Sequence, residues 1–99
     1  MPEPTLEALE EHFPQAVAAI SDDEFDSHDF ILSLARQQQR LYVKALAHYA
    51  DTNQPFKVVH AWLAKRLLAY PGLATKIGYG SSRDIFGDPC GAAKWQKVR

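Results

Sequence analysis

Residues 27–50, SHDFILSLARQQQRLYVKALAHYA, decide the fold of this chain. Their apolar side chains recur at the helical period of about 3.6 residues and fall on one broad side of a helix. This side comprises Phe30, Ile31, Leu34, Ala35, Leu41, Tyr42, Ala45, Leu46 and Tyr49. Other elements typically pack around a helix with so broad an apolar side, and at about 1.5 Å per residue it would be about 36 Å long. We therefore expect one continuous core helix, with Leu34 and Leu41 near the middle of its buried face.

Two acids mark the start of this helix. Asp26 and Asp29 stand three residues apart, a spacing at which each side chain can accept a hydrogen bond from the backbone of the other. Phe25, just before the cap, is placed to pack against Phe30 in the first turn. Gln38 is the one polar residue well inside the apolar side. We expect it to bond a backbone group, a water or a partner chain.

Two further helical segments flank the core helix. Residues 6–20 carry an apolar stripe at helical spacing, and Pro14 predicts either a break there or a second short helix with the proline in its first turn. After a turn at residues 51–55, residues 56–70 predict another helix, which Pro71 and Gly72 end.

The chain beyond residue 70 has a different composition, because all five glycines lie there. Thr75, Ile77 and Tyr79 alternate as in a strand, and residues 93–98 could pair back onto them. We expect a single, mostly α domain over residues 1–99, with three or four helices around residues 27–50. An irregular or short β-hairpin segment would complete it at the C-terminal end.

Charge is strongly segregated along the chain. Residues 1–34 carry nine acids and no lysine or arginine, whereas residues 35–99 carry eleven lysines and arginines and three acids. Arg36, Arg40 and Lys44 stand four residues apart, so on a continuous helix they would form one cationic row. This row would face solvent or the acidic segment near Glu7 and Glu11, or it would contact phosphate groups.

The sequence offers no set of residues that points to catalysis, a cofactor or a metal. His12, His28, His48 and His60 lack the short paired spacings of zinc ligands. A serine, not a lysine, follows the glycines at 78 and 80, so a phosphate-binding loop is not indicated. Turn formation explains Asp84 and Asp88 as well as an acid pair does. We expect a non-enzymatic protein without metal or cofactor, and whether the Cys90 thiol is reactive stays open.

The sequence also predicts the cellular compartment. A lone cysteine cannot form an internal disulfide, and the first residues lack the basic and apolar regions of a signal peptide. Charged residues interrupt every apolar run, so we expect no membrane partner and a cytoplasmic location.

The functional prediction follows from the grouped charges and aromatic side chains. The candidate interaction surface consists of Arg36, Arg40, Lys44, Trp62, Lys65, Arg66 and Trp95. We expect a protein-interaction module that binds a protein partner or a second copy of itself as a homodimer. The alternative is a nucleic-acid-associated protein, in which the basic row and the basic and aromatic tail at residues 94–99 would neutralise phosphates and stack on bases.

Overall fold

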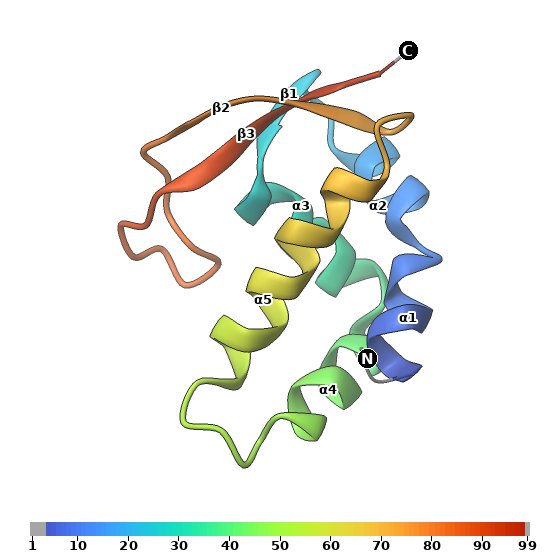
Figure 1. Ribbon diagram of the computed structural model, residues 1–99, viewed down its shortest axis with the longest axis vertical. Coiled ribbons are helices and arrows are strands. Elements are labelled where there is room, and N and C mark those ends of the chain that lie inside the picture. The colour runs from blue at the N-terminus through green and yellow to red at the C-terminus, as the bar shows by residue number, and fades with distance from the viewer. Residues whose placement is uncertain (1–3, 99) are drawn as a thin grey trace.

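The computed structural model describes residues 4–98, which form helices and a small sheet in an α+β arrangement (Figure 1). In chain order the elements are α1 (Pro4–Glu10), α2 (Phe13–Ala19), β1 (Glu24–Asp26), α3 (Ser27–Gln37), α4 (Gln39–His48), α5 (Pro55–Arg66), the 3-10 turn η1 (Leu67–Ala69), β2 (Ala74–Gly80) and β3 (Ala92–Lys97). The predicted mostly α class is wrong, because three strands form an antiparallel sheet rather than a short hairpin.

The sheet has the order β1-β3-β2, with β3 in the centre. Phe25 of β1 pairs with Trp95, and Trp95 pairs with Lys76 of β2 on the other side. A register shift between Lys76 and Gly78 bends β2. The sequence did not predict β1, because a strand of three residues is too short to show an alternating pattern.

The predicted continuous core helix is also wrong, because the chain breaks at Gln38 into α3 and α4. Gln38 has φ −124° and ψ 54°, outside the helical region, and Figure 1 shows the chain changing direction there. A straight helix of about 36 Å would match the longest dimension of the molecule, 37 Å. The break instead allows α3 to pack on α2 and the sheet, and α4 to pack on α1 and α5.

Several local predictions are confirmed. Asp26 and Asp29 form the reciprocal capping box, with N–H to carboxylate distances of 2.9 and 3.0 Å. Pro14 lies in the first turn of α2, and the helix predicted after the 51–55 turn is present as α5 followed by η1. These features depend on residues within one helical turn of each other, which sequence rules describe well.

Trp95 joins the sheet to the helices. Its ring is only 1% exposed, and its indole N–H donates to the Ser27 hydroxyl at 3.0 Å. The buried side chains form one cluster, in which Phe13 packs edge-on against Phe30 with ring centroids 4.9 Å apart. The inner face of the sheet is therefore fixed on the start of α3.

No helix within residues 4–98 is long and apolar enough to span a lipid bilayer.

Replacing Leu34 tests the assignment of the core. Leu34 is fully buried, so Leu34→Ala should lower the free energy of unfolding by about 2–5 kcal/mol through the cavity it leaves. Leu41 is only partly buried, so Leu41→Ala should cost less, and Arg40→Ala, at an exposed position, should cost little. Urea denaturation of the three variants measures this, and equal losses at all three sites would contradict the assignment.

Candidate functional site

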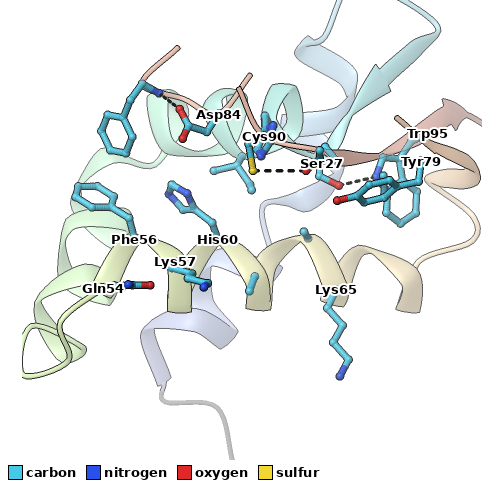
Figure 2. Close-up of a pocket in the computed structure, with 18 of the residues that line it drawn as sticks. Ser27, Gln54, Phe56, Lys57, His60, Lys65, Tyr79, Asp84, Cys90 and Trp95 are labelled. Atoms are coloured by element: carbon cyan, nitrogen blue, oxygen red, sulfur yellow. Dashed lines mark hydrogen bonds between the residues drawn. The ribbon is translucent and has the colours of Figure 1, made fainter. Parts of the chain in front are cut away.

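A groove of about 960 Å³ lies between α5 and the sheet. One wall is α5, the other is formed by β2, β3 and the β2–β3 loop (residues 81–91), and the first turn of α3 contributes His28 and Ile31. Figure 2 shows Phe56 and His60 rising from α5 toward Asp84 and Cys90 of the loop. The groove therefore brings together residues from both halves of the sequence.

The wall formed by α5 follows from the two faces of that helix. Val59, Leu63 and Leu67 are fully buried and face the core. The neighbouring strip, at steps of four residues, is Phe56, His60, Ala64 and Leu68, and it lines the groove. The two strips are adjacent on a helical projection, so the sequence does not separate the core residues of this helix from the groove residues. The groove itself was not predicted.

Aromatic side chains define the two ends of the groove. At one end the rings of Phe56 and Phe86 meet edge to face, with centroids 4.9 Å apart. Toward the other end the ring of Tyr79 lies directly over Gly91, where an added Cβ would be 2.6 Å from the tyrosine hydroxyl oxygen. Only glycine leaves room for Tyr79 in this position.

His60 is a titratable group of the groove that is hydrogen-bonded to α4. Its Nε2 lies 2.5 Å from the hydroxyl oxygen of Tyr42. Burial lowers the pKa of His60 to about 4, and burial raises the pKa of Tyr42 to about 12. At neutral pH the tyrosine hydroxyl therefore donates to an uncharged imidazole, whose remaining proton we assign to Nδ1. His60 bonds a side-chain hydroxyl, not the backbone carbonyl that a core histidine commonly bonds.

Asp26, Ser82 and His28 fasten the β2–β3 loop to the start of α3. The Ser82 hydroxyl donates to Asp26 at 2.6 Å, and His28 Nδ1 lies 3.0 Å from the same hydroxyl oxygen. Burial alone would raise the pKa of Asp26, but hydrogen bonds from Ser82 and the Asp29 N–H, together with the nearby charge of Lys94, lower it. In a nucleophilic triad the imidazole takes the serine proton, whereas here that proton faces Asp26. This cluster holds the loop in place.

The acids and the thiol of the loop have local roles. Asp84 accepts the backbone N–H groups of Phe86 and Asp88 at 2.9 and 3.0 Å, and Gly87 completes this turn with φ +87°. Cys90 is exposed, with its Sγ 3.6 Å from the Gly91 carbonyl oxygen. Within residues 4–98, no group of three or more His, Cys, Asp or Glu side chains is placed to hold a metal ion.

The structure separates the residues of the predicted interaction surface. Trp95 is buried, with 1% of its surface exposed, and Trp62 is partly buried against the core. Arg66 pairs with Glu10 of α1 at 2.6 Å, while Lys65 lines the groove.

The cationic row is also divided between two helices. Arg36 lies on α3, and Arg40 and Lys44 lie on α4, all of them exposed. Within the described part of the chain, no acidic side chain lies within 4.0 Å of these three cations. In the predicted basic tail, Lys94 approaches Asp26 at 3.6 Å, and Arg99 lies outside the described residues.

Comparisons with protein-family models, with curated proteins and with solved structures found no match to this chain.

The shifted pKa of His60 predicts a pH dependence of stability. Because its pKa is about 4 in the folded protein and about 6.5 when exposed, the unfolded state binds more protons between these values. The free energy of unfolding should therefore fall as the pH is lowered from about 6.5 to about 4, and this contribution should level off below that.

Urea denaturation across this pH range, with His60→Gln and His48→Gln as a matched pair, isolates the effect. His48 is exposed and lies outside the groove, so only His60→Gln should flatten the dependence. An NMR titration that places the His60 pKa near 6.5 would contradict the assignment.

Proposed function

We propose that this chain is a non-enzymatic protein-interaction module that binds an apolar segment of a partner in the groove. One observation carries this proposal. Apolar side chains that line the groove remain exposed: Phe56 at 39%, Leu68 at 54%, Phe86 at 60% and Tyr79 at 71%. Apolar surface gathered in one concave site is typical of a binding surface, because a partner that covers it removes it from water.

The size and composition of the groove favour a partner segment that inserts several side chains. About 960 Å³ is at the upper end of the range for ligand sites in proteins, and it can accept several side chains rather than one. Aromatic residues, which supply much of the binding energy at protein interfaces, stand at both ends of the groove as Phe56, Phe86 and Tyr79.

The hydrogen bonds of the polar groups support binding rather than catalysis. The Tyr42 hydroxyl is engaged with His60, the Ser82 hydroxyl with Asp26, and Asp84 with two backbone N–H groups. None of these bonds prepares a nucleophile or a general base for a substrate. The free thiol of Cys90 fits a reducing compartment, so we place the interaction in the cytosol.

Filling the groove tests the proposal. Peptides selected on the protein from a random 16-residue display library should bind at least tenfold more weakly to Ala61→Trp, because the new ring occupies the groove. Ala47→Trp is the matched control, since Ala47 is also an exposed helical alanine but lies outside the groove. Fluorescence anisotropy with labelled peptides measures both affinities, and circular dichroism verifies the fold.

Two results would overturn the proposal. One is a selection that returns no binding peptide, and the other is a set of peptides that bind the two tryptophan variants equally well. Self-association that Ala61→Trp abolishes would keep the groove as an interaction site and make its partner a second copy of the chain.

Nucleic-acid association remains a second candidate because of one observation. Arg36, Arg40 and Lys44 are exposed, and no described acid pairs with them. If these cations contact phosphates, affinity for a DNA duplex should fall steeply between about 50 and 200 mM salt. Replacing all three with alanine should then reduce the slope of log affinity against log salt by about 2 to 3. Weak binding with an unchanged slope would reject this candidate.

A further inference from the structure

The backbone of the walls limits which conformation a buried segment can adopt in the groove. β2 is an edge strand with one unpaired side. Along the rest of the walls, β3 is paired on both sides and the backbone groups of α5 bond within the helix, so these two elements offer no row of free N–H and C=O groups. An extended segment would leave its own backbone groups without partners along these two elements, which is costly in an apolar site. A helix satisfies its backbone internally. The groove therefore suits a helical occupant.

The length of the groove matches such a helix. Its wall on α5 and η1 runs from Phe56 to Leu68, which at about 1.5 Å per residue is about 18 Å, or slightly more than three turns. Between these ends the lining includes four small residues, Ala61 and Ala64 of α5 and Ala92 and Ala93 of β3. Large apolar side chains from one face of a partner helix fit above these small residues.

The charges around the groove have one dominant sign. Lys57 and Lys65 of α5 and Lys76 of β2 line the groove, and all three are exposed. Figure 2 shows the Lys65 side chain extending from α5 away from Tyr79 and Trp95, with its ammonium group on the solvent side of the helix. Asp84 is the only acid among the described lining residues, and two backbone N–H groups donate to its Oδ1. The rim thus favours negative charge on the partner.

We propose that the groove receives an amphipathic α-helix of about three turns from a protein partner, an inference that rests on the function proposed above. Its apolar face lies between α5 and the sheet. Aspartate and glutamate side chains flank that face and meet the lysines of the rim.

The same random 16-residue peptide library tests this inference when the selected peptides are characterised. They should carry net negative charge, with apolar residues three and four positions apart, and should become helical on binding, as followed by NMR of labelled peptide. The double variant Lys57→Glu/Lys65→Glu should weaken binding by about tenfold, because two attractive contacts become repulsive. Arg40→Glu/Lys44→Glu, with the same change in net charge outside the groove, should change the affinity by no more than about twofold.

The outcomes separate this inference from the function on which it rests. Peptides that Ala61→Trp excludes, but that bind in an extended form, carry positive charge or ignore the lysine reversal, would overturn the acidic helix and leave the groove as the interaction site. Equal weakening by both double variants would also overturn it. The loss of affinity would then come from the net charge of the protein, not from contacts with Lys57 and Lys65. A second copy of the chain in the groove would overturn the inference that the helix belongs to a different protein. Absence of any groove-binding peptide would overturn the proposed function itself.

Discussion

The contact between Trp95 and Ser27 is the interaction on which the rest of the structure depends. Trp95 lies at the centre of β3, beside Phe25 of β1, and its indole N–H is satisfied by the first residue of α3. A buried indole contributes a large apolar area but requires a partner for its N–H, so this one side chain fixes both the depth and the orientation of the sheet on the helix. The inner face of β3, and with it one wall of the groove, is set by that contact.

The parts of the fold that the sequence predicted are those decided within a few residues. The Asp26 capping box and the Pro14 start of α2 depend on neighbours one turn away. The break at Gln38 could not be predicted in the same way, because the apolar residues on both sides of it keep one helical period. The break lets α3 pack on α2 and the sheet and α4 pack on α1, while both helices contact α5. Local periodicity contains no information on those partners.

The candidate site also contains features that local sequence could not predict. Lys94, Gln96 and Lys97 surround Trp95 in the sequence and suggested an exposed aromatic residue, although strand alternation turns Trp95 inward. On α5, adjacent helical strips carry both core and groove residues, and only the packing of the other elements determines which strip is covered. The hydrogen bond between His28 and Ser82 joins residues that are 54 positions apart in the sequence, and sequence patterns do not predict contacts over such a separation.

The same packing explains why the groove stays open. α5 and η1 contact the core through Val59, Leu63 and Leu67, and Phe56 and Leu68 of the neighbouring strip stay exposed. Ala61 and Ala64, which line the groove on α5, have short side chains that leave space beside β3. The Phe56–Phe86 ring contact and the Asp26–Ser82 hydrogen bond hold the loop. Because these contacts form part of the fold, a partner that binds as proposed would not need to order the loop. A groove prepared in this way loses less conformational entropy on association, which favours tight binding by a short segment.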